Sequence, residues 1–412
     1  MNDDVCNGRL HQPARNHGSS PALPGWTAVL SLTMGVFGLL TAEYLPASLL
    51  TPMAASLHIS QAEAGQSITA TAVAALFAGL ALPSLTRKLD RRTVLLAFGA
   101  LMIVSNLLVA VSPNLAMLLA MRTLLGVALG GFWSMAAAVT MRLVPPASVS
   151  RALSIIFSGI AIGTVVSVPL GSYLGGLFGW RSAFFAAAAL GTATFIVQWL
   201  NLPPMPARNP AQGASSLGLL RRRAVGSAML GCVLAHTGQF ILFTYIRPAL
   251  EFAARIDVEQ LSLLLLAFGV ANFLGTLLAG WLMDRSLRAT LVVMPAFVGL
   301  AALGIVLLPT AGVALIPGVT FWVALWGLAF GGVPVAWSRW VTHAIPDQAE
   351  AAGGMVVAAV QASIAAGAGL GGWMFSRGGI SAVFINGGLV MLSAAAFIAL
   401  FARTPVPPRH PA

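Results

Sequence analysis

Charged residues are scarce in this 412-residue chain. They make up 8% of it, against roughly 25% in ordinary soluble domains, while hydrophobic residues make up 58% and the mean hydropathy is +0.89. A water-soluble protein of this length could not cover its surface with so few charges, so a soluble fold is excluded. The only two cysteines are Cys6 and Cys232, and they suggest no disulfide framework.

Several functional motifs are also missing. The sequence has no G-x-x-x-x-G-K-[ST] phosphate loop, which argues against ATP-driven chemistry. It has no H-E-x-x-H, no cysteine-rich metal cluster and no G-x-S-x-G. The first 24 residues carry Asp3 and Asp4 and no apolar core, which excludes a cleaved signal peptide. We therefore expect neither an enzyme nor a cofactor or metal site.

What the chain does have is a series of long apolar runs. Each is about 20 residues or more, enough for a helix to cross a hydrocarbon core of about 30 Å. The pattern predicts an all-α integral membrane protein with twelve transmembrane helices. These helices are expected at 26–50, 63–86, 93–111, 115–140, 152–177, 182–202, 224–248, 260–283, 289–309, 314–342, 351–376 and 380–402.

The distribution of basic residues predicts the orientation. With the N-terminus in the cytoplasm, 16 of the 22 Lys and Arg residues lie on the cytoplasmic side, as the positive-inside rule requires. The basic residues behind the net charge of +11 then set the orientation in the membrane and contact anionic lipid headgroups, and they do not indicate nucleic-acid binding. We expect a cytoplasmic N-terminal tail (1–25), a six-helix half (26–202), a cytoplasmic linker (203–223), a second six-helix half (224–402) and a cytoplasmic C-terminal tail (403–412).

An internal repeat supports the two halves. Residues 126–145 align without a gap on 327–346 at an offset of 201, and scattered identities elsewhere keep that register. Parallel repeats in a membrane protein indicate a transporter with its site between the halves. The matched pairs include Tyr44 with Tyr245, Gly79 with Gly280, Arg87 with Arg288 and Gly171 with Gly372.

Glu43 is the acidic residue farthest from any loop. It lies about five residues, or roughly 7 to 8 Å, outward of the centre of its span, where a charge costs at least about 2.5 kcal/mol. Arg122 lies at about the same depth in another span. Burial favours the protonated acid whereas a nearby guanidinium favours the carboxylate, which suits a group that takes up and releases protons. A neutral glutamic acid with a structural hydrogen bond is the alternative.

Other polar and aromatic residues within spans are candidates for a solute site. A lone buried His or Asn more often satisfies its hydrogen bonds within the core, and a Gly most often serves packing. For Arg339 the sequence leaves two roles open, that of an anchor at the lipid interface and that of a residue of the site. The candidates for substrate binding are Tyr44, Trp133, Ser134, His236, Gln239, Tyr245, Trp337 and Gln361.

Five segments are distinctive: AEYLPASLLTP (42–52), GGFWSMAAAVTMRLVP (130–145), GWRSAFF (179–185), GQFILFTYIRP (238–248) and WGLAFGGVPVAWSRW (326–340). They resemble segments of the major facilitator superfamily, within it the twelve-helix drug/proton antiporters, and most closely the purine ribonucleoside efflux pumps. Arg122-Thr-Leu-Leu-Gly126 matches a family motif whose Arg is implicated in proton transfer. The glycines from Gly159 to Gly176, with Pro169, look like a variant of the antiporter motif.

The loop motif G-x-L-x-D-R is kept in the second half, where it ends in Asp284 and Arg285. The first half departs from it, because basic residues including Arg87 and Arg91 remain without the expected Asp. The resemblance implies gating roles for these four residues and for Pro169.

The sequence and the resemblance together predict a proton-coupled efflux transporter of small solutes that works by alternating access. The resemblance implies purine ribonucleosides such as inosine as the solutes. Glu43 and Arg122 would couple the protons. A sugar or drug exporter of the same superfamily is an alternative, and a non-transporting receptor or scaffold is one of another class. We expect a monomer in the bacterial inner membrane, with small solutes, protons and lipid as partners and no nucleic acid.

Overall fold

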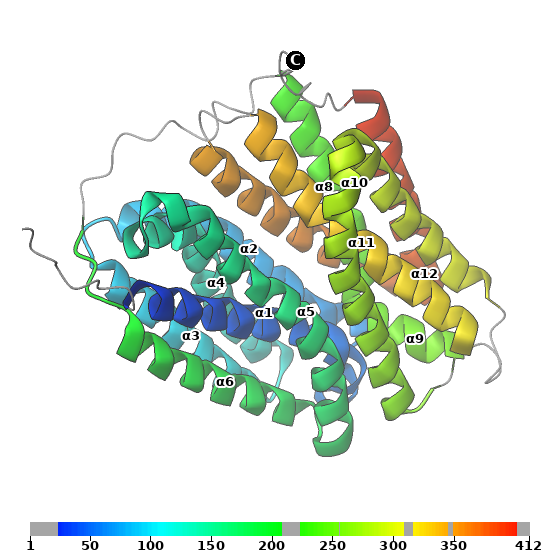
Figure 1. Ribbon diagram of the computed structural model, residues 1–412. Coiled ribbons are helices and arrows are strands. Elements are labelled where there is room, and N and C mark those ends of the chain that lie inside the picture. The colour runs from blue at the N-terminus through cyan, green and yellow to red at the C-terminus, as the bar shows by residue number, and fades with distance from the viewer. Residues whose placement is uncertain (1–23, 208–222, 255, 309–315, 345–348, 402–412) are drawn as a thin grey trace, which may run out of the picture.

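The computed structural model describes residues 24–207, 223–254, 256–308, 316–344 and 349–401, and every regular element within them is a helix (Figure 1). The first tail apart from its last two residues, most of the expected linker and the whole of the second tail lie outside the described residues. The helices form two groups, α1 to α6 and α8 to α12, which lie against each other near the end that carries α9 (Figure 1).

The first group holds six long helices and one short 3₁₀ turn. They are α1 (Pro24–Leu57), α2 (Gln61–Leu85), α3 (Arg91–Ala110), α4 (Leu115–Leu143), η1 (Pro146–Ser148), α5 (Val149–Phe178) and α6 (Trp180–Asn201). Several begin at a side-chain cap, which satisfies an otherwise unpaired N–H group of the first turn. Ser60 forms a capping box with Glu63 at the start of α2, and Asn114 caps α4.

The second group has fewer but longer helices. They are α8 (Arg223–Thr244), α9 (Ile246–Ala254), α10 (Val258–Leu307), α11 (Ile316–Ala344) and α12 (Ala349–Phe401). The 50-residue α10 is interrupted by non-helical backbone at Ser286, and the 53-residue α12 at Gly378 and Gly379. Within the described ranges, ten helices are long and apolar enough to cross a membrane.

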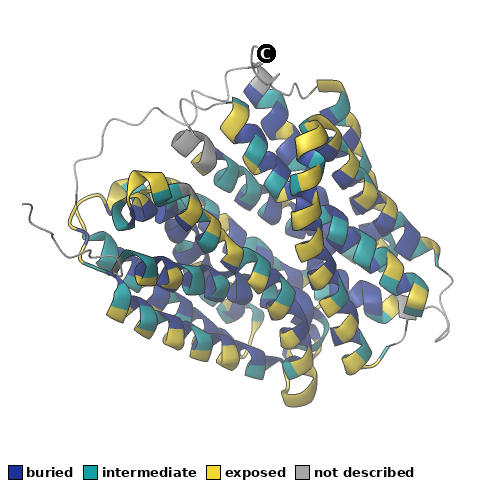
Figure 2. Ribbon diagram, in the orientation of Figure 1, coloured by how far each residue is buried: buried dark blue, intermediate teal, exposed yellow. Residues whose placement is uncertain are grey.

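Large apolar side chains cover much of the outer surface of the helices. Phe77, Leu200 and Leu277 are each at least 60% exposed, and exposed positions run along the outward faces in Figure 2. Such a surface would be costly in water but suits contact with lipid tails. The chain is therefore a multi-pass membrane protein.

The expectation of one constant register between the halves holds only in part. The first residues of α4 and α11, Leu115 and Ile316, keep the repeat offset, and so do their last residues. The capping residues of α2 and α10, Ser60 and Asp257, fall four positions short of it. Gly179 and Gly379, with positive φ angles of 82° and 64°, fall one position short. Loop-length differences between the halves therefore shift the register from one helix to the next.

Glycines let backbones touch within each half. A Cβ atom on Gly130 of α4 would overlap the Ala75 carbonyl of α2, and one on Gly331 of α11 would overlap the Asn272 carbonyl of α10. Close packing of this kind replaces the hydrophobic effect in lipid. Each half is therefore held by direct helix contact.

The halves meet along α2 with α12 and along α5 with α10. Near the first contact, Gly65 of α2 leaves room for the Tyr245 hydroxyl group. In the second pair, Gly176 leaves room for Val258, and Gly269 lies against the backbone of α5 at Val165. Gly65, Gly176 and Val258 all lie close to the ends of their helices, on the side of α9.

The chain that leaves α6 is tied back to the first half. The Asp90 carboxylate accepts a hydrogen bond from the Met205 N–H group at 3.0 Å, and the Arg91 N–H group donates to the Met205 carbonyl at 2.9 Å. Arg142, at the end of α4, donates to the Pro206 carbonyl at 2.8 Å. The first residues of the expected linker are thus bound to the first half.

Candidate functional site

Arg122 lies completely buried in the middle of the first half. Its guanidinium group donates to the carbonyl oxygens of Ala42 at 2.8 Å and Glu43 at 3.2 Å, both in α1, and to that of Ser67 in α2 at 3.4 Å. An arginine keeps its charge at any physiological pH, so a buried one needs such partners. One cation therefore joins α4 to α1 and α2.

The Glu43 side chain lies beside this cation without forming an ion pair. Glu43 is 5% exposed, and its Oε1 atom is buried and has no hydrogen-bond partner. The described residues contain two ion pairs, and neither includes Glu43 or Arg122. Arg122 contacts the Glu43 main chain, so its positive charge acts on the carboxyl group from a short distance.

Gln361 of α12 brings a group from the second half to the same place. Its side-chain amide approaches the Glu43 carboxyl group, and its buried Nε2 atom has no hydrogen-bond partner. An unpaired buried acceptor near an unpaired buried donor costs free energy that a bound solute, water or proton can recover. The two groups can thus respond to what enters between the halves.

An aromatic cluster fills the corresponding part of the second half. Trp326 of α11 packs edge-on against Phe268 and Phe384, at ring-centroid distances of 5.2 and 5.9 Å. The Trp326 indole N–H group donates to Gln239 Oε1 of α8 at 2.7 Å. This bond fixes the amide so that its NH₂ group faces away from Trp326, free to donate elsewhere.

Tyr44 connects the cluster to the first half. It follows Glu43 directly, and its ring packs edge-on against Phe243 of α8 at 5.4 Å. Phe243 in turn packs against Phe268 at 5.7 Å. The structure thereby brings together Glu43, Tyr44, Gln239 and Gln361 in one neighbourhood.

His236 lies one turn before Gln239 on α8. Its Nδ1 atom is 2.9 Å from the Cys232 carbonyl, which can only accept, so Nδ1 carries the hydrogen and donates. The ring packs edge-on against Phe330 of α11 at 6.2 Å. The neutral imidazole then presents Nε2 as an acceptor.

The other candidates for substrate binding lie apart from this neighbourhood. Trp133 packs between Phe132 and Phe157, and the Ser134 hydroxyl group donates to the carbonyl of Gly131 in its own helix. Tyr245 stacks on Phe375 at 5.3 Å, where α8 meets α9. Trp337 packs against Trp340 and its buried indole nitrogen has no hydrogen-bond partner.

The candidate gating residues differ in their surroundings. Asp284 forms an ion pair with Arg339 of α11 at 2.7 Å, so Arg339 contacts the loop motif of its own half. Arg285 lies over the Trp281 ring, 3.3 Å from its centroid. Arg91 donates to Thr86 and contacts the Met135 sulfur, while Arg87 is exposed and outside both ion pairs of the described chain. Pro169 is buried within α5, which continues through it as one helix.

The sequence reasoning missed the buried charges of α9 and the phenylalanines of the aromatic cluster, Phe243, Phe268 and Phe384. Neither Arg247 nor Glu251 is among the candidates named from the sequence, yet Arg247 is only 6% exposed and pairs with Glu251 at 2.7 Å. The spacing of four residues on a short amphipathic helix was the available signal. In the described part of the chain, no three His, Cys, Asp or Glu side chains gather in a way that could hold a metal ion.

Comparison with known proteins agrees with this architecture. The family model of the Major Facilitator Superfamily matches residues 32–311 and 228–412. The purine ribonucleoside efflux pump NepI of Salmonella typhi is 40% identical over 391 residues, covering 93% of this chain and 96% of the pump. NepI of Escherichia coli O1:K1 / APEC is 41% identical over 388 residues, with 92% and 96% covered.

Solved structures show the same fold at low sequence identity. A D-xylose–proton symporter matches with a TM-score of 0.72 and 17% identity, covering 92% of this chain and 98% of the symporter. A bacterial homologue of the lysosomal transporter Spinster, inward-facing and unoccupied, matches with a TM-score of 0.67 and 16% identity, covering 93% and 96%. Fold, sequence identity and family model agree, and the chain belongs to the major facilitator superfamily of transporters.

Proposed function

We propose that this protein exports purine ribonucleosides across the bacterial inner membrane in exchange for protons. The observation that carries the proposal is the buried Glu43 carboxyl group beside Arg122, whose Oε1 atom has no hydrogen-bond partner, in a chain about 40% identical to purine ribonucleoside efflux pumps. Efflux against a gradient needs an energy source, and the sequence carries no nucleotide-binding motif. A proton is the coupling ion that a carboxyl group can carry.

The proposed topology has twelve crossings in two six-helix halves, 26–202 and 224–402. A straight helix of 50 residues would be about 75 Å long, more than twice the hydrocarbon thickness of about 30 Å. The breaks at Ser286 and at Gly378–Gly379 therefore divide α10 and α12 into two crossings each. Both termini lie in the cytoplasm by the charge distribution, which places α9 on the outer side.

Proton transfer is assigned to Glu43. The protonated acid is neutral and compatible with a closed, buried state, whereas the carboxylate gains from Arg122 and from donors such as Gln361. Proton entry down a membrane potential releases about 2.3 kcal/mol per charge per 100 mV, which drives the return of the carrier. Arg122 holds α1 and α2 in place while Glu43 changes charge.

Substrate binding is assigned to the residues around Glu43 and the aromatic cluster. Tyr44 offers a ring face or edge for a purine base, and Gln239 and Gln361 offer amide donors for its ring atoms and the ribose hydroxyl groups. His236 offers an acceptor one turn away. Trp133, Ser134, Tyr245 and Trp337 line or support the path at other levels.

Purified protein in proteoliposomes with an acidic lumen tests the proposal. Export coupled to proton entry predicts that purine ribonucleosides added outside dissipate the gradient, reported by a lumenal pH dye. Glu43→Gln is the matched control, because the amide keeps the size but not the proton, and it should show no dissipation. Dissipation by sugars or lipophilic cations alone would favour another exporter of the superfamily, and none with any solute would favour a scaffold.

A single chain is the proposed functional unit. Each six-helix half contacts the other within one chain, so the site needs no second copy. The basic loops meet anionic lipid headgroups, and nucleic acid has no part in the function.

A further inference from the structure

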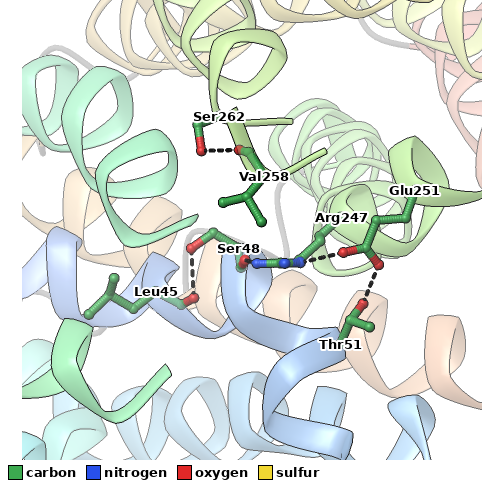
Figure 3. A network of polar contacts seen from close by, with 7 residues as sticks. All are labelled: Leu45, Ser48, Thr51, Arg247, Glu251, Val258 and Ser262. Carbon is green, nitrogen blue, oxygen red and sulfur yellow. Dashed lines mark hydrogen bonds and ion pairs between the residues drawn. The ribbon is translucent and has the colours of Figure 1, made fainter. Parts of the chain in front are cut away.

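A polar network joins the two halves at the end of the molecule that carries α9. The Arg247 side chain donates through Nε to Glu251 Oε1 at 2.7 Å and through Nη1 to the Ser48 carbonyl of α1 at 2.7 Å (Figure 3). Glu251 Oε2 accepts a hydrogen bond from the Thr51 hydroxyl group of α1 at 2.6 Å. The ion pair on α9 is thus hydrogen-bonded to two successive turns of α1.

The burial of this network makes it costly to disturb. The Arg247 side chain is 7% exposed and that of Glu251 28%, while Ser48 is fully buried. The two charges stay paired on α9, but separating α9 from α1 breaks the bond from Arg247 to the Ser48 carbonyl and the bond from Thr51 to Glu251, and exposes the pair to water. Charge-assisted hydrogen bonds are about twice as strong as neutral ones.

The contacts around the network close the same end. Tyr245 precedes α9, and its hydroxyl group fits against Gly65 of α2. Val258 follows α9 and packs where Gly176 of α5 has no side chain. A solute leaving between the halves at this end has to separate α9 from α1.

We propose that Arg247 and Glu251 form a latch that holds the transport path shut on the α9 side and has to release once in each transport cycle. Both are positioning residues, because they act by setting which side of the site is open. The latch rests on the alternating access of the proposed function, but on neither its substrate nor its coupling ion. Weakening it shifts the carrier towards the state open on the α9 side.

Thiol accessibility tests the latch directly. Thr69 of α2 faces Gly369 of α12 between the halves, so Thr69→Cys in a Cys6→Ser/Cys232→Ala background reports access. An impermeant thiol reagent is applied from either side, with intact cells and with everted vesicles. Arg247→Gln and Glu251→Gln should each raise the ratio of α9-side to opposite-side labelling about tenfold, as loss of a hydrogen bond to a charged group implies. Arg247→Lys should give an intermediate ratio.

Arg181→Gln is the matched control. Arg181 also contacts α1, donating to the Ser56 hydroxyl group at 2.9 Å and to the Ser112 carbonyl at 3.1 Å, but both these partners lie within the first half. Its substitution should leave the labelling ratio unchanged. An unchanged ratio in both latch variants, or an equal change in Arg181→Gln, overturns the proposal.

A cross-linking variant tests the latch independently, in case the Arg247 and Glu251 substitutions impair folding. In Thr51→Cys/Glu251→Cys, a short reducible bifunctional thiol reagent should tie α9 to α1, stop solute counterflow and release it on reduction. In each single-cysteine chain the reagent should leave the counterflow rate at the value measured before treatment. Full counterflow in the cross-linked protein overturns the latch, whereas a wrong substrate in the proposed function leaves the labelling result intact.

Discussion

The two halves share a helix plan but place their charges at different levels. In the first half Arg122 is completely buried within its span and binds three carbonyl groups, whereas the residue at the matching repeat position of the second half is Val323. In the second half Arg339 pairs with Asp284 at the helix ends, and its counterpart in the first half is Ala138. Duplication has thus left one half to carry a charge inside the membrane and the other to carry a pair at its rim.

The difference also appears in what fills each half. Trp326, in the aromatic cluster, corresponds to Leu125, and Phe243 to Ala42, whose carbonyl accepts from Arg122. Small residues in the first half let a guanidinium group reach the backbone, and large rings in the second half remove that space. We therefore assign proton handling to the first half and the aromatic face of the site to the second.

The largest effect is expected from Glu43→Gln. Gradient-driven uptake into everted vesicles should fall at least about tenfold, because the amide cannot take up a proton. Adding Thr244→Glu, the corresponding position in the second half, should not restore uptake, since Val323 offers no cation. Glu259→Gln, exposed on α10, is the control and should keep full uptake. Rescue by the second-half carboxyl group would show that the two halves are interchangeable in coupling.

Arg122→Met should destabilise the protein more than any change at the rim. It removes the guanidinium donor from the carbonyl groups of Ala42, Glu43 and Ser67. The Ser67 carbonyl still accepts from the Thr71 hydroxyl group at 2.9 Å, but that of Ala42 has no helical donor because residue 46 is a proline, and a buried group left unpaired costs about 1–3 kcal/mol. A thermal unfolding scan in detergent should show a clear fall in Tm. Arg142→Met, on the same helix with one exposed bond to Pro206, should shift Tm little. Equal shifts would mean that the buried cation does not hold the first half together.

Trp326→Phe tests the aromatic half of the comparison. It removes the donor that orients Gln239, so KM should rise about fivefold to tenfold while the maximal rate stays near normal. Trp322→Phe, one turn away on α11, is the control for loss of an indole ring. A fall in maximal rate with unchanged KM would place Trp326 in the conformational step instead of the site.

The smallest effect is expected at the rim of the second half. The Asp284 and Arg339 side chains are 71% and 33% exposed, and exposed ion pairs contribute about 0–1 kcal/mol. A double-mutant cycle of Asp284→Asn and Arg339→Gln on unfolding should give a coupling free energy in that range. A coupling free energy well above that range would mark the pair as a gate that the first half lacks.

Much of the fold could be predicted from the sequence because lipid imposes simple rules. Apolar runs of fixed length predicted the helices, and the depth of Glu43 and Arg122 in their spans placed them at one level before any contact was known. The predicted spans 351–376 and 380–402 leave a connection at 377–379, and there the backbone at Gly378 and Gly379 leaves the helical region. These inferences need only length, polarity and turn chemistry.

The remaining features depend on tertiary contacts that no local pattern encodes. Arg122 binds the Glu43 carbonyl and not its carboxylate, a choice made by how α1 and α4 pack. Arg247 and Glu251 were not among the candidates from the sequence because their partners on α1, Ser48 and Thr51, lie 199 and 200 residues away along the chain. The constant repeat offset was partly wrong, since short differences in loop length move α2 and α10 out of that register.

The bonds around Met205 set how far the two halves can separate at the termini side. Because Asp90 and Arg91 bind Met205, and Arg142 binds Pro206, the connection to the second half starts after residue 206 and not at the end of α6 at Asn201. Five fewer residues shorten its fully extended reach by about 17 Å. A chain cut after residue 207 keeps this anchor and should allow the two pieces to assemble when made separately. A chain cut at residue 202 loses this anchor, because its first fragment ends before Met205 and leaves the Asp90 carboxylate without that partner.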